Sequence, residues 1–243
     1  MTGASRGIGR AIAHAFASNG DRVAIHYRES AGPAAQALES LPGSGHTLVQ
    51  ADIADPDAVR RAVDQACKTL GGLDILVNNA GVFTPHPIRE VSYEEWQQAW
   101  QATLGVNLIG AANATWCAVQ HMIAGGGGRI INVSSRGAFR GEPGQPAYGA
   151  SKAGLNALGQ SLARALAPHG IAVATVAPGF VETAMAARHL DGPAGDAIRA
   201  ESPFGRVAKA EEIAAAVVYL ASPDAEWASG AILDLNGASY LRS

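Results

Sequence analysis

The chain has 243 residues, a formal net charge of −3, 48% hydrophobic residues and 16% charged residues. This composition excludes an intrinsically disordered chain, which combines low hydrophobicity with high charge. It also disfavours a nucleic-acid binder, because basic residues are not in excess. The length is typical of one α/β domain, so we expect residues 1–243 to form a single domain.

The two cysteines, Cys67 and Cys117, stand far apart, and neither has a second cysteine or a histidine at metal-ligand spacing. We therefore expect neither a disulfide framework nor a metal site. The sequence contains no run of 18 apolar residues, and no basic N-terminal region followed by an apolar run. These features predict a cytoplasmic protein that does not bind a membrane.

Short apolar runs alternate with longer helical patterns along the chain. In chain order, helices are expected at about 11–20, 34–40, 55–70, 92–122, 146–167 and 208–221, and strands at 23–25, 47–49, 73–77, 129–133, 171–176 and 231–235. Asp55 before Pro56, and Ser92 with Glu95 three residues later, are typical helix starts. The alternation indicates an α/β Rossmann fold, a doubly wound parallel sheet of about seven strands with helices on both faces.

One strand of such a sheet is missing from the pattern. A doubly wound sheet should begin with a strand before its first helix, but Met1, Thr2 and Gly3 already have the character of the turn that follows that strand. Without this strand, the sheet would lack backbone hydrogen-bond partners near its middle, which is costly.

The segment from Thr2 to Gly9 is rich in glycine and leads directly into a helix. Glycines allow a tight turn and a close approach of the backbone to a pyrophosphate, which a helix N-terminus attracts. A phosphate-binding loop of the NTPase type is excluded, because no Lys-Ser or Lys-Thr follows. An ordinary glycine-rich loop and a methyltransferase turn remain alternatives on this motif alone.

Dinucleotide sites often place an acidic residue about 20 residues further on, where it binds the ribose 2′-hydroxyl. Here Tyr27 and Arg28 occupy that place, and Glu29 follows them. Arg28 suits a 2′-phosphate, and Arg6 in the glycine turn is placed to help. The two cations favour NADP over NAD; in the NAD alternative, Glu29 binds the ribose.

Tyr148 and Lys152 are four residues apart in a predicted helix, so their side chains share one face. An ammonium group beside a phenol favours the ionised phenol and moves its pKa toward a value useful for proton transfer. Taken alone, the pair is a weak signal, because many surface helices carry one.

The order of motifs along the chain is more specific than any one of them. From Thr2 to its end, the sequence resembles the classical short-chain dehydrogenases/reductases. The matching segments are the glycine turn, Asp52-Ile53, Asn78-Asn79-Ala80-Gly81, Asn107, Ser135, Tyr148 with Lys152, and Pro178-Gly179 with Thr183.

The resemblance implies a catalytic set of Asn107, Ser135, Tyr148 and Lys152. Tyr148 would be the general acid in carbonyl reduction and the base in alcohol oxidation, and Ser135 would hold the substrate oxygen. Lys152 would bind the nicotinamide ribose and lower the pKa of Tyr148. Asn107 would hold a water that connects Lys152 to solvent. Ser134 is the neighbouring alternative to Ser135, with packing at the strand end as its other reading.

The resemblance also implies where a cofactor binds. Asp52 would reach the adenine amino group, with Ile53 packed nearby. The full set expected to bind the cofactor is Gly3, Ser5, Arg6, Gly7, Ile8, Gly9, Tyr27, Arg28, Asp52, Ile53, Asn79, Ala80, Gly81, Tyr148, Lys152, Pro178, Gly179, Val181 and Thr183.

The substrate is expected to contact Ser135, Tyr148, Arg136, Phe139 and Arg140, and Glu142 is expected to face the same pocket. The two arginines would suit an acidic or phosphorylated substrate; alternatively, they face water or a subunit contact. Residues 184–206, rich in Ala, Gly and Pro, are expected to form a mobile lid over this pocket.

Within the family, the chain is most similar to bacterial 3-oxoacyl-acyl-carrier-protein reductases, at residues 2–10 and 145–154. This implies an NADP(H)-dependent oxidoreductase that interconverts a ketone and a secondary alcohol, with a small-molecule or acyl-thioester substrate. Residues 122–128 are neutral, and His169 stands where an arginine is common, which weakens the carrier-protein assignment.

Two alternatives stay open. One is a sugar, steroid or other small-alcohol dehydrogenase, and the remote one is a non-catalytic dinucleotide-binding regulator. Family members are usually homotetramers, so the resemblance also implies pairing through the helices at residues 92–122 and 145–167.

Overall fold

The computed structural model describes residues 1–242, apart from the side chains of Met185, Arg188, His189 and Pro193. The described residues form six strands in two parallel sheets. One sheet pairs β1 (Ala24–Tyr27) with β2 (Thr47–Gln50). The other has the order β3 (Ile75–Asn78), β4 (Gly128–Val133), β5 (Ile171–Pro178) and β6 (Ile232–Leu235).

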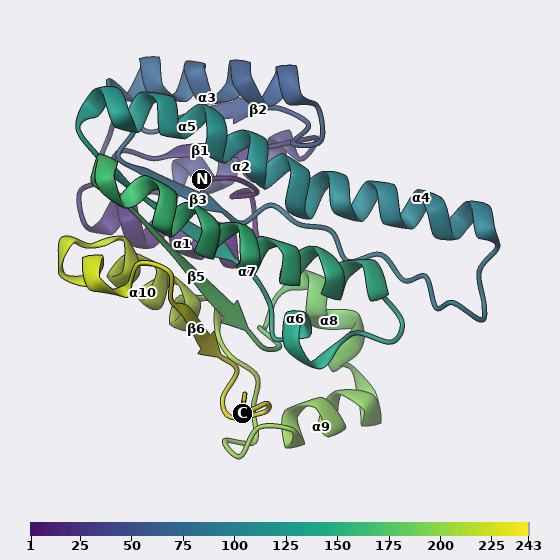
Figure 1. The fold of residues 1–243 in the computed structure, drawn as a ribbon. Coiled ribbons are helices and arrows are strands. Elements are labelled where there is room, and N and C mark those ends of the chain that lie inside the picture. The colour runs from purple at the N-terminus through teal and green to yellow at the C-terminus, as the bar shows by residue number, and fades with distance from the viewer. Residues whose placement is uncertain (243) are drawn as a thin grey trace.

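Helices connect the strands and cover both faces of the two sheets (Figure 1). The α-helices are α1 (Gly7–Ser18), α2 (Ala31–Glu39), α3 (Pro56–Leu70), α4 (Tyr93–Leu104), α5 (Ala111–Gly125), α6 (Gly137–Arg140), α7 (Pro146–Leu166), α8 (Ala184–Leu190), α9 (Gly192–Ala200) and α10 (Ala210–Ala221). A π-helix, η1 (Gly105–Gly110), joins α4 to α5, and the 3₁₀ helices η2 (Ala167–His169) and η3 (Pro223–Ala228) follow α7 and α10.

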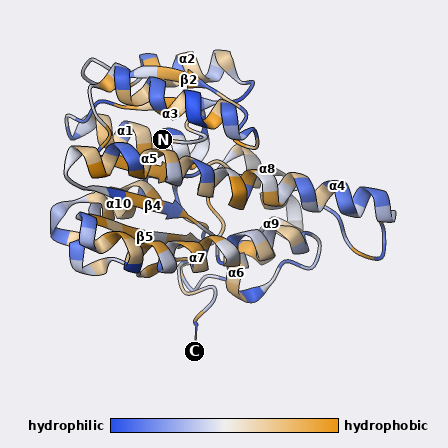
Figure 2. Cartoon of the chain, turned by 45° about the horizontal axis from the view of Figure 1, so that its top comes forward, coloured by the Kyte–Doolittle hydropathy of each residue, from blue (hydrophilic) through white to orange (hydrophobic). Residues whose placement is uncertain are grey.

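The strands β1, β3, β4 and β5 are largely buried, which explains their nearly continuous apolar sequences. On β4, Ile131 packs in the core that contains α1, α2 and α10, while Ile130 packs in the core that contains α5 and α7. All eight residues of β5 are buried, and most of the strand is coloured as hydrophobic (Figure 2). These contacts confirm the predicted fold class.

Two predicted helix starts are confirmed in detail. The side chain of Asp55 accepts hydrogen bonds from the backbone N–H groups of Asp57 and Ala58, with Pro56 at the first helical position. Ser92 and Glu95 form the expected reciprocal capping box at the start of α4. Each bond satisfies an N–H group that the first helical turn leaves without a partner.

The helical stretch 93–125 is long and apolar enough to cross a membrane by length and composition alone. Half of its most apolar window is buried inside the protein, because α5 packs between α3 and the larger sheet. The buried half of these apolar residues is thereby explained as part of the core.

The sequence predicts one continuous sheet of about seven strands, but the described residues form two separate sheets, one of two strands and one of four. A cavity of about 380 Å³ lies between β1 and β3, lined by Val23, Ala24, Ile75 and Leu76 among other residues. At its end, Met1 bonds to β1 through the N–H of His26 and the carbonyl of Ala24. Thr2 donates its backbone N–H to Val77 of β3 at 3.0 Å. Residues 1–4 therefore connect the two sheets by hydrogen bonds beside this cavity.

His26 of β1 fastens the glycine turn to this junction. Its Nδ1 accepts the N–H of Gly3 at 3.1 Å, and its Nε2–H donates to the carbonyl of Ala51 at 3.1 Å. Burial, and then the positive charge of the amino terminus, lower the pKa of His26 to about 4, although Asp52 opposes the shift. The contact with Gly3 requires the neutral ring, because Nδ1 can accept only when it carries no hydrogen, and burial maintains this form.

We expect His26 to make stability depend on pH in a defined window. Between the ordinary pKa of 6.5 and the folded value of about 4, the unfolded chain binds a proton that the folded chain does not. The free energy of unfolding should therefore fall as the pH falls, by about 2 kcal/mol between pH 7 and pH 5 from this residue.

Urea unfolding of the wild type and of His26→Gln at pH 7 and pH 5 measures this contribution. The variant should lose less stability on acidification than the wild type, whereas His14→Gln, on the exposed face of α1, should behave as the wild type does. Equal losses in the wild type and His26→Gln would show that His26 does not cause the dependence.

Candidate active site

A cleft of about 390 Å³ opens at the carboxyl ends of the strands. In open α/β sheets this edge is where ligands bind. Every residue predicted to bind the cofactor lines this cleft, together with Ser135 and Arg136. The segments come from distant parts of the sequence: the glycine turn, the ends of β1 to β5, and the start of α7.

The glycine turn has the shape that its sequence predicts. Gly3 has a φ of +63°, and a Cβ there would lie 2.8 Å from Cα of Ala80. A Cβ on Gly9 would run into the carbonyl oxygen of Gly3. The turn ends at Arg6, the N-cap of α1, which makes no side-chain capping bond. The first N–H groups of α1 are thus available for an anion at the helix N-terminus.

A side-chain network holds this turn against the end of β3. The hydroxyl of Thr2 accepts the N–H groups of Asn79 and Ala80 at 2.9 and 3.0 Å and donates to the carbonyl of Val77. The amide of Asn79 donates to the carbonyls of Thr2 and Gly3. Asn79, which was expected to bind the cofactor, therefore also holds the shape of the turn from Thr2 to Gly9, here called the glycine cradle. The sequence analysis had assigned no separate role to Thr2.

The far end of the cleft carries the residues expected to choose between NADP and NAD. The side chain of Arg28 is 51% exposed and pairs with Glu29 at 3.0 Å. Arg6 is exposed on the same cleft. Asp52 accepts the N–H of Ala54 through Oδ1 at 2.9 Å. An exposed arginine paired only with its neighbour can exchange that partner for a phosphate, because such pairs are weak.

Tyr148 and Ser135 meet in the cleft from different elements. Ser135 follows β4 and Tyr148 lies in the first turn of α7, and both line the cleft, where Ser135 is close enough to lower the pKa of the Tyr148 phenol. Ser135 also accepts the N–H of Gly137 at 3.0 Å. The hydroxyl of Ser134 instead donates to the carbonyl of Lys152 at 3.2 Å. The geometry therefore brings Ser135, rather than Ser134, to Tyr148.

Burial shifts the pKa values of Tyr148 and Lys152 in opposite directions. It raises the pKa of the Tyr148 phenol; the bond from Ser135 lowers it, and the charge of Glu142 raises it further. Desolvation lowers the pKa of Lys152 to about 8. The Lys152 ammonium donates to the carbonyl of Val133 at 2.8 Å and lies 5.8 Å from the centre of the Tyr148 ring. That Lys152 lowers the pKa of Tyr148 stays a prediction.

Asn107 stands in the π-helix η1 and lies outside the described lining of the cleft. Its amide oxygen accepts the N–H of Val82 at 2.8 Å, and its amide nitrogen donates to the carbonyl of Val82 and to Ser151. A Cβ on Gly81 would lie 3.4 Å from Asn107 and 3.6 Å from the Lys152 ammonium. Asn107 is thus close to Lys152 and fixes the loop after β3. Single π-turns of this kind are frequent at functional sites.

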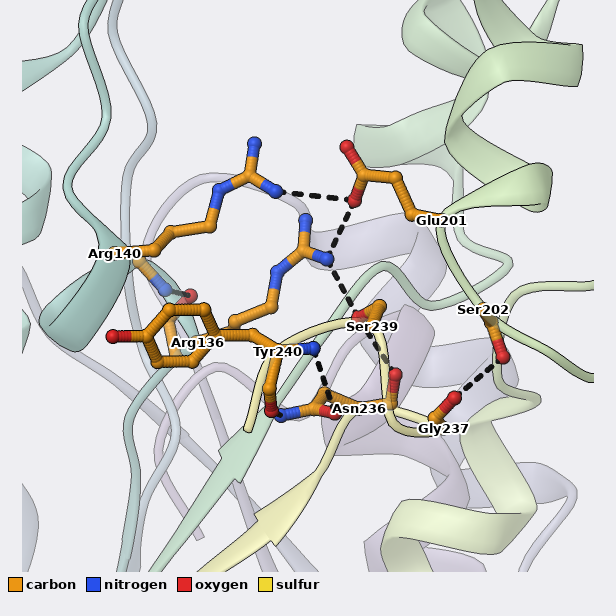
Figure 3. Close-up of polar contacts among 10 residues, drawn as sticks. Arg136, Arg140, Glu201, Ser202, Asn236, Gly237, Ser239 and Tyr240 are labelled. Carbon is orange, nitrogen blue, oxygen red and sulfur yellow. Dashed lines mark hydrogen bonds and ion pairs between the residues drawn. The ribbon is translucent and has the colours of Figure 1, made fainter. Parts of the chain in front are cut away.

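The two arginines predicted to hold a substrate are placed differently from each other (Figure 3). Arg136 lines the cleft, is buried, and donates through Nη1 to Glu201 and Ser239, both at 2.6 Å. Arg140 donates to the same oxygen of Glu201 at 3.1 Å. Burial opposes the ionisation of Glu201, yet the two arginines hold its pKa below the ordinary value.

The predicted substrate contacts stay a prediction, and their residues are placed differently in the structure. Arg140 and Phe139 fall outside the described residues that line the cleft, and the guanidinium of Arg242 covers the Phe139 ring at 4.4 Å. Because Glu201 already binds both arginines, a two-arginine site for an acidic substrate is not favoured. The residues form a clasp instead: Arg136, Arg140, Glu201 and Ser239 join α6 to the end of α9 and to the C-terminal segment.

Two further residues lie beside Tyr148: Phe83, which the sequence did not single out, and Glu142, which was expected to face the pocket. The ring of Phe83 meets that of Tyr148 edge-on, with centroids 4.7 Å apart. Glu142 lines the same part of the cleft, and its charge acts on the phenol. Both come from loops, where neither spacing nor periodicity predicts a position in space. Phe180 joins them in the lining, with Arg136 5.5 Å from the centre of its ring.

The arrangement is suited to moving a proton at an oxygen atom beside a bound dinucleotide. The glycine cradle and the helix N-terminus suit a pyrophosphate, because Gly3 and Gly9 let the turn pack closely and the N-terminus of α1 leaves backbone N–H groups available. Ser135 and Tyr148 offer two hydroxyl groups to one acceptor. Lys152 brings a desolvated ammonium to the same region. This combination suits hydride transfer coupled to proton transfer.

Curated relatives match nearly the whole chain. The family model described as enoyl-(acyl carrier protein) reductase matches residues 3–237. The 3-oxoacyl-[acyl-carrier-protein] reductase of Staphylococcus aureus (strain Mu50) is 36% identical over 243 residues, covering 99% of this chain and 97% of that protein. The enzyme of that name from Escherichia coli (strain K12) is 37% identical over 241 residues, covering 99% and 96%.

Two solved structures are also similar to this chain over nearly its whole length. A short chain dehydrogenase from Burkholderia cenocepacia J2315, in complex with NADP, is 38% identical with a TM-score of 0.88, covering 98% of this chain and 96% of that chain. A dehydrogenase/reductase from Sinorhizobium meliloti 1021 is 33% identical with a TM-score of 0.89, covering 99% and 94%. The sequence motifs, the cleft and these matches agree, and the chain therefore belongs to the short-chain dehydrogenase/reductase family.

Proposed function

We propose that the chain is an NADP(H)-dependent oxidoreductase that interconverts a ketone and a secondary alcohol, acting on 3-oxoacyl thioesters. The observation that carries the reaction class is that Ser135, Tyr148 and Lys152 line the same cleft as the glycine cradle. The substrate class is supported by the names of the relatives that are 36% and 37% identical over nearly the whole chain.

The chain's own groups provide the proton chemistry in this proposal. The bound nicotinamide supplies the hydride to the carbonyl carbon. Ser135 donates a hydrogen bond to the carbonyl oxygen, and Tyr148 donates the proton that this oxygen takes up as the C–O bond becomes single. The Lys152 ammonium stabilises the phenolate left behind, an interaction that is stronger in a desolvated site than in water. In alcohol oxidation, the same groups act in reverse.

NADP is the proposed cofactor. Arg28 and Arg6 border the cleft where the adenosine ribose would lie, so they offer two cations to a 2′-phosphate. The Burkholderia cenocepacia relative, 38% identical, was solved with NADP. Asp52 and Ile53 would bind the adenine, while Pro178, Gly179, Val181 and Thr183 would bind the nicotinamide end.

A free ketone or small alcohol is the second candidate substrate. Docking of an acidic carrier protein would need accessible cations near residues 122–129. Arg129 is only 15% exposed there, and it pairs with Glu226 at 3.1 Å and donates to the carbonyls of Gly128 and Gly170. This engagement favours substrates that do not arrive on a carrier protein.

Residues 184–206 form the proposed lid. They contribute α8 and α9, and the clasp on Glu201 holds their C-terminal end to α6. The other end is held where Val181 pairs with Ala208. With both ends fixed, α8 and α9 would be the parts that move over the substrate.

We also propose that residues 1–243 form a single domain.

The proposed assembly is a homotetramer. Ile109, Trp116 and Ile123 are 53%, 64% and 41% exposed, and their spacing of seven residues places them on one side of the continuous helix. A second exposed apolar set, Tyr219, Trp227 and Leu233, lies near β6. Two separate apolar patches on one chain would permit two kinds of pairing, as a tetramer with two-fold axes requires.

Tyr148→Phe tests the reaction class. Removing the phenol hydroxyl should lower kcat by at least about 100-fold, because the proton donor is lost. The affinity for NADPH should stay within about threefold, because the ring and the cradle remain. The assay follows NADPH oxidation at 340 nm with a short 3-oxoacyl thioester. Tyr93→Phe, at an exposed tyrosine of α4, is the matched control. A Tyr148→Phe enzyme with normal turnover would overturn the assignment.

The same assay separates the two substrate candidates. A 3-oxoacyl thioester should be reduced with a higher kcat/KM than a simple ketone of similar size. If only the simple ketones turn over, the thioester proposal fails while the reaction class stands.

Arg28→Ala tests the cofactor choice. We expect NADPH to bind about tenfold more weakly, because one hydrogen-bonded charge pair is removed at an exposed site. The affinity for NADH should change little. Fluorescence titration of both cofactors measures the ratio, with Arg10→Ala on the exposed face of α1 as control. An equal loss for NADPH and NADH would refute a role in 2′-phosphate recognition.

Trp116→Glu tests the assembly. A buried carboxylate would oppose pairing through α5, so the particle should fall from four chains to two, because the patch near β6 remains. Light scattering coupled to size-exclusion chromatography gives the mass directly. An unchanged tetramer would show that Trp116 lies outside the subunit contacts, and a wild-type monomer would refute the tetramer.

A further inference from the structure

His86 is a buried titratable residue that the chemistry above does not use. It is 1% exposed and lies in the loop between β3 and α4. Its neighbours are Pro85 and Pro87. Each proline fixes its own φ and restricts the residue before it, so the imidazole is presented from a stiff segment.

The partners of His86 define its protonation state. Nδ1 lies 2.7 Å from the carbonyl oxygen of Thr84, which can only accept, so Nδ1 carries the hydrogen. Nε2 lies 3.1 Å from the backbone nitrogen of Ala147, which can only donate, so Nε2 accepts. The ring is therefore the neutral Nδ1–H tautomer. Its backbone N–H also donates to the carbonyl of Gly144 at 2.8 Å.

The bond to Ala147 completes the start of α7. The N-cap residue Gln145 makes no side-chain capping bond, so the N–H groups of the first turn need acceptors from elsewhere. Nε2 of His86, 61 residues away in the sequence, is the hydrogen-bond acceptor for the N–H of Ala147. Ala147 is fully buried, which makes an unpaired N–H there costly. The next residue is Tyr148, whose own N–H bonds to the carbonyl of Gln145.

The same loop also touches the Tyr148 ring directly. Phe83, three residues before His86, packs edge-on against it at 4.7 Å. On its other side, the His86 ring meets Trp96 of α4, with centroids 5.4 Å apart and planes at 68°. His86 therefore connects the loop after β3 both to α4 and to the first turn of α7, which carries Tyr148.

We propose that His86 is a positioning residue for Tyr148. Its neutral imidazole caps α7 and sets the place of the phenol relative to Ser135, while the cofactor cradle on the opposite side of the cleft does not depend on it. The kinetic part of this inference rests on the proposed function. The structural part does not, because the bond to Ala147 can be followed without turnover.

Three substitutions separate positioning from packing. His86→Phe keeps a ring against Trp96 but removes the acceptor for Ala147. His86→Gln has an amide oxygen that reaches about as far as Nε2, whereas the shorter His86→Asn reaches only the position of Nδ1. His14→Phe, at an exposed histidine of α1, is the matched control.

The first readout is kinetic. His86→Phe and His86→Asn should lower kcat about tenfold, because small displacements of a reacting group are costly. KM for the ketone should change less than kcat, and the NADPH affinity should stay within about twofold. His86→Gln should recover most of kcat. The second readout is amide hydrogen exchange of Ala147, which should be faster in Phe and Asn variants and return toward the wild-type rate in Gln.

The outcomes are distinct. If His86→Phe lowers only the unfolding temperature, with kcat and Ala147 exchange unchanged, His86 has a packing role and the proposal is wrong. If His86→Phe does not fold, the comparison of Gln with Asn decides, since equal kcat and equal exchange in those two variants would also refute it. If the wild type reduces no ketone, the proposed function fails, and Ala147 exchange still tests the cap.

Discussion

The hydrogen bonds made by residues 1–4 are the constraint on which the sheet and the cofactor cradle both depend. Met1 bonds to β1, and Thr2 bonds to β3, so this short segment joins the two sheets. It then runs directly into Gly3, whose N–H is held by His26 and whose carbonyl is held by Asn79. A change that loosens the segment would therefore act on the fold and on the dinucleotide site together.

The other organising effect in the cleft is desolvation. Burial raises the pKa of Tyr148 and lowers that of Lys152, so it disfavours the charged form of both groups. The hydrogen bond from Ser135 opposes the shift at the phenol. A substrate oxygen bound between the two hydroxyl groups would enter a site with little water to compete for it. Proton transfer there is controlled by a few fixed groups rather than by solvent.

Much of this arrangement could be predicted from the sequence, because local rules set it. Helical spacing put Tyr148 and Lys152 on one face, and the capping residues Asp55 and Ser92 marked helix starts that the structure confirms. The strands at the edge of the cleft followed from their apolar runs, so the residues after them were expected to converge. All of the expected cofactor residues do line one cleft.

The rest depended on contacts between loops that no periodicity encodes. Phe83 and Glu142 reach Tyr148 from segments without regular structure. Glu201 pairs with both Arg136 and Arg140 from about 60 residues away, a contact that no spacing in the sequence indicates. The π-helix that carries Asn107 has no signal in apolar spacing, because the pattern of α4 and α5 continues through it.

The clasp of Arg136, Arg140, Glu201 and Ser239 has a consequence for ionic strength. The side chains of Arg136 and Glu201 are 3% and 31% exposed, whereas those of Arg28 and Glu29 are 51% and 77% exposed. Salt screens exposed charge pairs much more than buried ones. Raising the salt concentration should therefore separate Arg28 from Glu29 at the cofactor end of the cleft while the clasp still holds the end of α9 to α6.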